Sequence, residues 1–185
     1  ANSYSIDWGT TDSKNYAISE ELGTLTVTTN ATAAVKLIAA DAEKVYDGTP
    51  LTKADGVTWE GLPAGFTVEA SSTGSQTNAG ESANVVNDGY VIYDANNVDQ
   101  TANFTNVTKE PGTLTVTKAP VTIKTGSAEK EYDGTALTKD EASISGLVNG
   151  ETATVTATGS QTEVGESANS YSIDWGTTDS KNYAI

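Results

Sequence analysis

The hexapeptide GTLTVT occurs twice in this chain, at residues 23–28 and at residues 112–117. Leu and Val alternate with Thr in it, so that Leu114 and Val116 fall on one face of an extended strand and the threonines on the other. Turn dipeptides such as Asp47-Gly48 and Asn149-Gly150 separate further alternating segments. The pattern predicts an all-β fold of short strands joined by tight turns.

Two levels of repetition surround this hexapeptide. Residues 1–18, ANSYSIDWGTTDSKNYAI, recur unchanged at 168–185, which gives a period of 167 residues. Inside that period, VKLIAADAEKVYDGT at 35–49 matches VTIKTGSAEKEYDGT at 121–135, which divides the period into a long module of about 86 residues and a short one of about 81. The identical ends indicate a piece of a longer periodic array.

The repeats predict three parts. Residues 1–33 are the C-terminal part of a short module, 34–119 form a complete long module, and 120–185 are the N-terminal part of a short module that lacks its last strand. We expect strands at 25–28, 114–117 and 152–158, and one strand face formed by Tyr171, Ile173 and Trp175, as by the identical Tyr4, Ile6 and Trp8. Residues 31–43 read as linker plus strand. The modules are expected to be small and β-sandwich-like, or alternatively β-grasp-like, and arranged in an elongated tandem array.

The composition excludes several classes of function. The chain has 185 residues and a formal charge of −15, with no Cys, Met or His, and all ten basic residues are Lys. Disulfides, thiol chemistry, a Ser-His-Asp triad and the usual zinc sites are therefore impossible, and no basic patch exists to bind nucleic acid. We expect no catalytic residues, no cofactor and no membrane insertion by this segment.

The paired YDGT segments are the most conspicuous motif. Tyr46, Asp47 and Gly48 in the long module correspond to Tyr132, Asp133 and Gly134 in the short one. One hypothesis makes the tyrosines ligand-stacking groups. The favoured interpretation is a Tyr packed at a domain edge, with Asp-Gly forming the turn.

Two chemical possibilities concern other side chains. Asp94, Asn96 and Asp99 carry oxygen ligands at near-alternating positions, a weak calcium candidate that an Asn/Asp-rich hairpin tip would also explain. A Lys–Asn isopeptide bond of the kind found in some bacterial surface stalks would pair Lys44 or Lys130 with Asn103 or Asn182, and it requires a desolvated lysine.

The order EKxYDGT…GLVNGE…GSQT…VGES…YSI…NYAI…GTLTVT resembles the MBG/YDG-type tandem repeats of very long bacterial surface proteins. The short module matches best, at 129–135, 146–151 and 182–185. The long module departs from the pattern, with GLPAG at 61–65 and Asn103-Phe104-Thr105 in place of NYA. The resemblance implies a β-rich, adhesin-like module strung in tandem on a secreted, surface-attached protein, and it implies no catalytic residues.

We therefore expect a structural stalk or fibre segment on the bacterial cell surface that projects a functional tip. Its partners would be neighbouring modules of the same or an identical chain. One alternative is an adhesin module that binds a host glycan or protein. The other is a filament subunit assembled when an unfinished module accepts the SEELGTLTVT strand of another chain.

Overall fold

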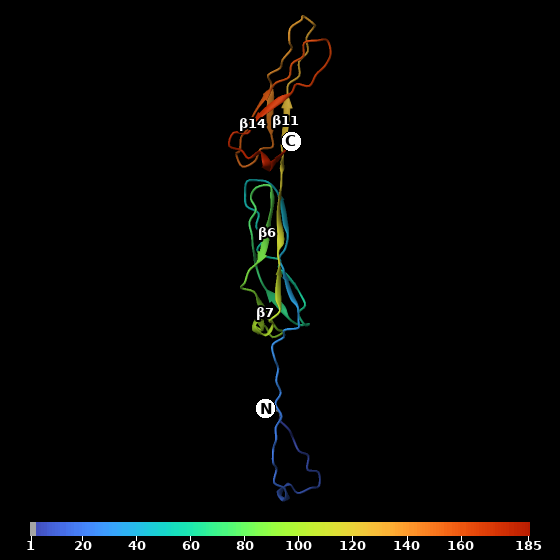
Figure 1. The fold of residues 1–185 in the computed structure, drawn as a ribbon, viewed down its shortest axis with the longest axis vertical. Coiled ribbons are helices and arrows are strands. Elements are labelled where there is room, and N and C mark those ends of the chain that lie inside the picture. The colour runs from blue at the N-terminus through green and yellow to red at the C-terminus, as the bar shows by residue number, and fades with distance from the viewer. Residues whose placement is uncertain (1–2) are drawn as a thin grey trace.

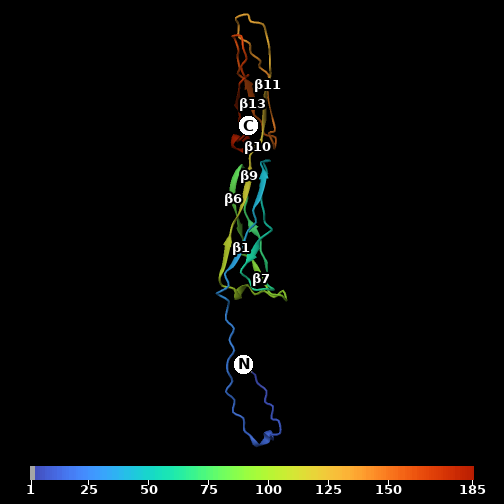
Figure 2. The ribbon, with the colours of Figure 1, turned by 90° about the vertical axis from the view of Figure 1, so that its right-hand side faces the viewer.

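The computed structural model describes residues 3–185, so the first two residues of the predicted segment 1–33 lie outside it. The chain forms a rod in which two β modules lie end to end (Figure 1). Residues 3–29 extend as an open loop from one end of the rod, and the module that contains the C-terminus lies at the other end (Figure 2).

The long module contains strands β1 to β9, which form three sheets. Their bounds are β1 (Val35–Ile38), β2 (Ala42–Val45), β3 (Thr58–Glu60), β4 (Thr67–Glu69), β5 (Ser72–Thr73), β6 (Gly80–Val86), β7 (Val91–Tyr93), β8 (Val107–Glu110) and β9 (Gly112–Thr117). The sheet orders are β3-β1-β8, β2-β9-β6-β5 and β4-β7. A single 3-10 turn, η2 (Thr101–Asn103), precedes β8.

The first and last strands of the long module run side by side in parallel. β1 pairs with β8 and β2 pairs with β9, with Lys44 opposite Val116 in the second pair, whereas β6 pairs with β9 in the antiparallel sense. The chain therefore enters and leaves the module in the same direction, and successive modules can follow one another along one axis. The hairpin turns read from the sequence do not predict this parallel pairing.

Apolar side chains alternate with polar ones along the strands of the long module, and the apolar face that the sequence pattern indicated is the buried one. Val35, Leu37 and Leu114 are fully buried, and Phe66 packs edge-on against Phe104 with ring centroids 5.2 Å apart. Complete burial of a Leu or Val side chain stabilises a fold by roughly 1.5–3 kcal/mol. The all-β prediction is confirmed, and residues 31–43 are indeed linker plus strand, since β1 and β2 lie there.

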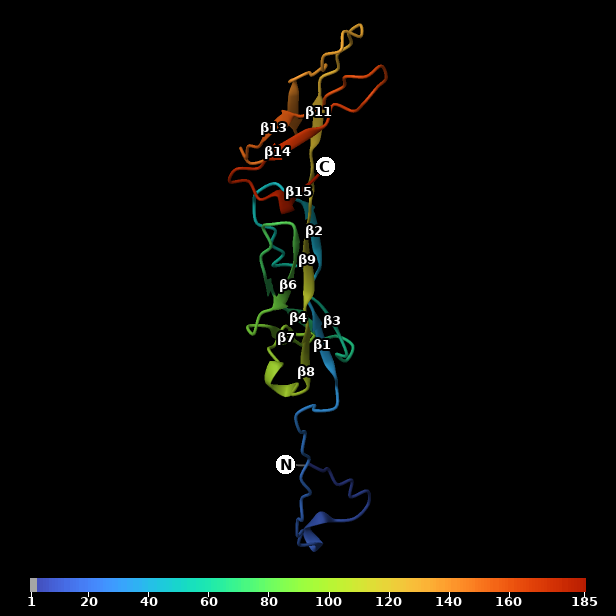
Figure 3. The same ribbon diagram turned by 45° about the horizontal axis from the view of Figure 1, so that its top comes forward.

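The short module contains shorter and more exposed elements. Their bounds are β10 (Ala119–Pro120), β11 (Thr122–Thr125), β12 (Ala142–Ser145), β13 (Thr154–Ala157), β14 (Tyr171–Asp174), η3 (Ser180–Asn182) and β15 (Tyr183–Ala184). β11 pairs with β12, β13 with β14, and β10 with β15, the last pair in parallel. Because β8 to β11 follow one another with single-residue breaks, one extended stretch of chain runs through both modules (Figure 3).

The expectation of strands at 25–28 and around Tyr4, Ile6 and Trp8 is wrong for this chain. In residues 3–29 the only regular element is a 3-10 turn, η1 (Ser13–Asn15), and Leu25 and Val27 are largely exposed. A strand requires a second strand that pairs with its backbone N–H and C=O groups, and among the described residues no strand pairs with residues 4–8 or 25–28. Among residues 3–185, no helix is long and apolar enough to cross a membrane.

Candidate functional site: the junction between modules

The YDGT segment of the long module is held by a lysine. Lys44 Nζ donates to Asp47 Oδ1 at 2.6 Å and to Thr49 Oγ1 at 2.8 Å, and the Thr49 N–H donates to the same Asp47 oxygen at 2.8 Å. The Lys44 ammonium and the donors of Thr49 hold the pKa of Asp47 well below its usual range. The turn is thereby fixed by residues within five positions of one another.

The short module repeats this turn. Lys130 Nζ donates to Asp133 Oδ1 and to Thr135 Oγ1, each at 2.7 Å, and the pKa of Asp133 is lowered chiefly by Lys130 and then by Thr135. The two tyrosines differ. Tyr46 is 5% exposed and Tyr132 is 62% exposed, because only the first lies against another module.

Tyr46 lies at the centre of the contact between the modules. Its hydroxyl donates to Glu151 Oε1 at 2.5 Å, and the Tyr183 hydroxyl donates to Glu151 Oε2 at 2.6 Å. The two rings meet edge to face with centroids 5.6 Å apart, and Trp175 stacks on Tyr183 at 5.7 Å. One carboxylate of the short module therefore accepts hydrogen bonds from a tyrosine of each module.

The environment of the two hydroxyls raises both pKa values. The hydrogen bond to Glu151, then burial and the charge of Glu151, raise the pKa of Tyr46 to about 12. For Tyr183 burial is the main cause and the hydrogen bond to Glu151 the second, while the Val148 N–H that donates to its oxygen acts in the opposite direction. Both phenols are neutral donors at ordinary pH.

A second polar contact crosses the junction beside the aromatic rings. The Asn182 side chain is 1% exposed, accepts from the Ala79 N–H at 2.8 Å and donates to Asn78 Oδ1 at 3.2 Å. Such a buried amide requires its partners, so it favours one relative position of the two modules.

The two modules also approach each other closely at the backbone of Gly48. Gly48 has φ +79°, and a Cβ placed on it would lie 2.5 Å from the Cβ of Asn149 in the short module. Around this point Tyr46 and Val116 share a buried apolar cluster with Ala119, Val121 and Tyr183. We call this set of contacts, made by Tyr46, Gly48, Ala79, Asn149, Glu151, Trp175, Asn182 and Tyr183, the junction.

The calcium candidates lie at the turn that follows β7. Asp94 Oδ1 accepts from the N–H groups of Asn96 and Val98, at 2.8 and 3.0 Å, and Asp99 Oδ1 accepts from both donors of Thr101. Backbone N–H donors, that of Val98 first, lower the pKa of Asp94, and the Thr101 hydroxyl and N–H lower that of Asp99. The turn organises these carboxylates by its own hydrogen bonds. Within residues 3–185, no three acidic side chains converge as metal ligands would.

The isopeptide candidates lie in separate hydrogen-bond systems. Lys44 and Lys130 are bound to the aspartates of their own turns. Asn103 Nδ2 donates to Gln100 Oε1 at 2.6 Å, and Asn182 contacts Asn78 and Ala79. Among the described residues, no hydrogen bond therefore joins either lysine to either asparagine.

Sequence reasoning missed Glu151, Asn149 and Trp175 as interface residues. A signal for the first two was present, since GLVNGE at 146–151 of the short module is replaced by GLPAG at 61–65 of the long one. A position at which two related modules differ can mark a surface that meets a different neighbour. Which surface it meets follows only from the three-dimensional arrangement.

Two related β modules joined end to end through a built interface define a tandem-repeat β protein. Residues 121–185, about a third of the chain, match the family model of the MBG domain (YGX type), and this match confirms the resemblance to MBG-type repeat modules for the short module. The searches of curated proteins and of solved structures returned no match.

Proposed function

We propose that this chain is a spacer segment of a bacterial extracellular surface protein, in which MBG-type modules hold a functional tip away from the cell. The junction is the observation that carries the proposal. It joins an apolar cluster, two tyrosine–carboxylate hydrogen bonds and a buried asparagine. A contact of this kind supports a fixed angle between modules.

The path of the chain supports the same function. β8 to β11 lead from one module into the next without a flexible linker, and Ala119, in the connection, is 1% exposed. In a quasi-one-dimensional array each module contacts mainly its neighbours, so the length of the rod increases with the number of modules. The family match to a repeat module found in surface proteins agrees with this role.

A two-residue insertion tests the stiffness that this function requires. Gly-Ser inserted after Lys118 is expected to separate the modules, because it lengthens the connection between Thr117, which pairs with Val45 in the long module, and Ala119, which pairs with Tyr183 in the short one. Small-angle X-ray scattering of a dilute, monomeric sample should then show a shorter maximum dimension and a broader distribution of distances than the unmodified chain shows. The matched control is the same insertion after Asn97, at the exposed turn beyond β7, which should leave the dimensions unchanged. If the unmodified chain scatters like the Lys118 variant, the junction does not align the modules.

The location on the cell needs its own test. An antibody raised against this chain should label intact cells that produce the protein, and external protease should remove that label. Labelling only after the cells are broken open would contradict an extracellular position.

A further inference from the structure

The segments by which the chain enters and leaves the long module lie side by side. β1 pairs with β8, with Val35 opposite Val107, and β2 pairs with β9, with Ala42 opposite Leu114. The register is the same in both pairs, so residues 35–45 run along residues 107–117 as one parallel ribbon. A ribbon of this length extends for about 35 Å, at roughly 3.3 Å per residue.

The interruption between the two pairs is bridged by hydrogen bonds. Pro111, which has no N–H group to donate, lies between β8 and β9. On one side of it the Ala39 N–H donates to the Glu110 carbonyl at 3.0 Å, and on the other the Thr113 N–H donates to Asp41 Oδ1 at 2.6 Å. The two segments therefore remain joined where the regular ladder stops.

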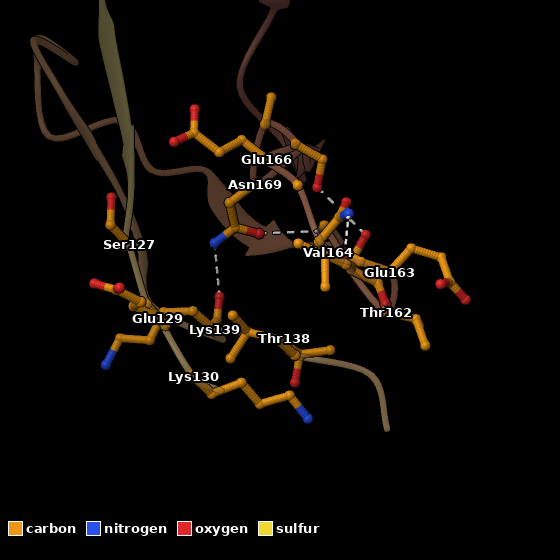
Figure 4. Close-up of a pocket in the computed structure, with 18 of the residues that line it drawn as sticks. Ser127, Glu129, Lys130, Thr138, Lys139, Thr162, Glu163, Val164, Glu166 and Asn169 are labelled. Carbon is orange, nitrogen blue, oxygen red and sulfur yellow. Dashed lines mark hydrogen bonds between the residues drawn. The ribbon is translucent and has the colours of Figure 1, made fainter. Parts of the chain in front are cut away.

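An asparagine of the core holds the same interruption from β6. Asn84 is fully buried, and its Nδ2 donates to the Ala40 carbonyl at 2.9 Å. The short module repeats this device, since Asn169 Nδ2 donates to the carbonyls of Gly126 and Lys139, at 2.9 and 2.8 Å. Figure 4 shows this amide directed toward Lys139. The break between β1 and β2 is therefore fixed to the interior of the module as well as to the neighbouring strand.

Each of the two segments is also anchored on its other side. β1 pairs with β3, and β9 pairs with β6, both in the antiparallel sense. Side chains cross between the paired segments, where Lys36 forms an ion pair with Glu110 and the Thr117 hydroxyl donates to the Lys44 carbonyl at 3.3 Å. Neither segment can slide along the other without breaking these contacts.

Tension along the rod loads this ribbon lengthwise. The chain enters the long module at the end that carries the N-terminal segment and leaves it at the end that faces the short module (Figure 3). A pull on both ends therefore draws β1–β2 and β8–β9 in opposite directions along their own axes. The hydrogen bonds of the parallel ribbon are then loaded together, whereas a pull that separates the strands from one end breaks them one after another.

We propose that the long module is a mechanical clamp, in which the parallel pairing of residues 35–45 with residues 107–117 resists tension along the rod. The proposal rests on the spacer function for the source of that tension, because a spacer transmits any pull on its tip through each module. Forced unfolding is governed by the unfolding rate, so this resistance is distinct from equilibrium stability. The clamp can fail while the spacer function holds.

Single-molecule pulling in two directions tests the clamp, and the chain has no cysteine of its own to interfere with thiol-linked handles. Handles at Ala31→Cys and Lys118→Cys, both exposed and outside the strands, load the ribbon lengthwise. Handles at Ala31→Cys and Asn106→Cys lie at the same end of the ribbon and peel its strands apart. At one pulling rate the first pair should require a severalfold higher unfolding force. The lengthwise step is recognised by its extension of up to about 300 Å. Equal forces in the two directions would overturn the proposal.

A pair of substitutions tests the bridge within the ribbon. Asp41→Ala removes the acceptor of the Thr113 N–H, so it should lower the lengthwise unfolding force. The matched control Glu43→Ala removes the same charge from an exposed side chain of β2 and should leave that force unchanged. Circular dichroism of both variants should confirm that they fold. Equal forces for the two folded variants would overturn a clamp that is continuous across residues 39–41. Failure of the spacer function would appear instead in the scattering and cell-labelling experiments, which do not depend on force.

Discussion

Gly48 shows how one residue serves both a turn and an interface. Its φ of +79° favours glycine, and its missing side chain leaves room for Asn149 of the neighbouring module. Gly134, its counterpart in the short module, has φ +77° and would meet nothing within 4 Å if it carried a Cβ. The two positions therefore share the turn requirement, and among the described residues Gly48 in addition contacts a neighbouring module.

This pair gives a prediction with an internal control. Gly48→Ala and Gly134→Ala should each lower stability by about 1–2 kcal/mol, the cost of a left-handed backbone for a residue with a Cβ. Gly48→Ala should in addition displace Asn149 and loosen the junction, which scattering would detect as a loss of maximum dimension. An equal change in dimension for both variants would show that Gly48 has no special role at the interface.

The Tyr46 hydroxyl predicts a sensitivity of the junction to high pH. Its pKa is raised from 10.0 to about 12 when it docks on Glu151, so the stabilisation is complete below pH 10 and is lost as the pH rises through 12. We expect the difference in thermal midpoint between the native chain and Tyr46→Phe to shrink across this interval. Because both chains carry the same lysines, their common titration cancels in the difference. A difference that stays constant from pH 9 to 12 would contradict the assignment.

At the scale of the element, we expect the Lys-x-Tyr-Asp-Gly-Thr turn to contribute less to stability in acid than at neutral pH. The pKa of Asp133 lies below its ordinary value of 3.8, so its contribution is present above about pH 4 and is lost as the pH falls further. Asp133→Asn should therefore lower the thermal midpoint more at neutral pH than near pH 2. Asp140→Asn removes the same charge from an exposed side chain and should have little effect at either pH. An effect of Asp133→Asn near pH 2 as large as the effect at neutral pH would argue against the ion pair.

Whether a segment forms a strand depends here on a neighbouring strand to pair with rather than on the intrinsic β-preference of its residues. The predicted strands at 114–117, 152–158 and 171–175 coincide with β9, β13 and β14, because each has a neighbour that satisfies its backbone groups. The prediction at 25–28 fails although its sequence is that of β9. A pattern of alternating side chains indicates which face a strand would bury, and it does not supply the second strand.

Amide hydrogen exchange should distinguish these two copies directly. The amides of residues 114–116 are expected to be protected by at least 100-fold relative to those of residues 25–27 in a sample dilute enough to be monomeric. The measurement requires NMR, because peptides of identical sequence cannot be told apart by mass. Equal protection of the two copies would mean that residues 23–28 are paired with another strand in solution.

At the scale of the whole molecule, the parallel entry and exit of the chain convert small modules into a rod. The two modules share one extended stretch of chain, from β8 to β11 (Figure 1), and their facing ends are in contact through the junction. The formal charge of −15 on 185 residues favours repulsion between such rods in solution. Length, rather than the size of one core, is what this architecture provides.

Local turn structure follows from the sequence alone, and the duplicated segment demonstrates it. In residues 3–18 and again in 170–185, an aspartate accepts from the N–H two residues ahead, at Asp12 and at Asp179, and a 3-10 turn follows. A Trp–Tyr pair at 5.7 Å also forms in both copies. These contacts lie within about ten residues, so each copy contains all the partners that they need.

The tertiary structure decides the pairing of strands and the burial of side chains. Ile173 lies opposite Val155 in a sheet, whereas the identical Ile6 is exposed and unpaired; Tyr183 is 3% exposed and Tyr16 is 60% exposed. The same sequence thus gives a buried interface within residues 170–185 and an open segment within residues 3–18. The physical reason is that the backbone of a strand satisfies its hydrogen bonds with a second strand, and the fold decides where in the chain that second strand lies.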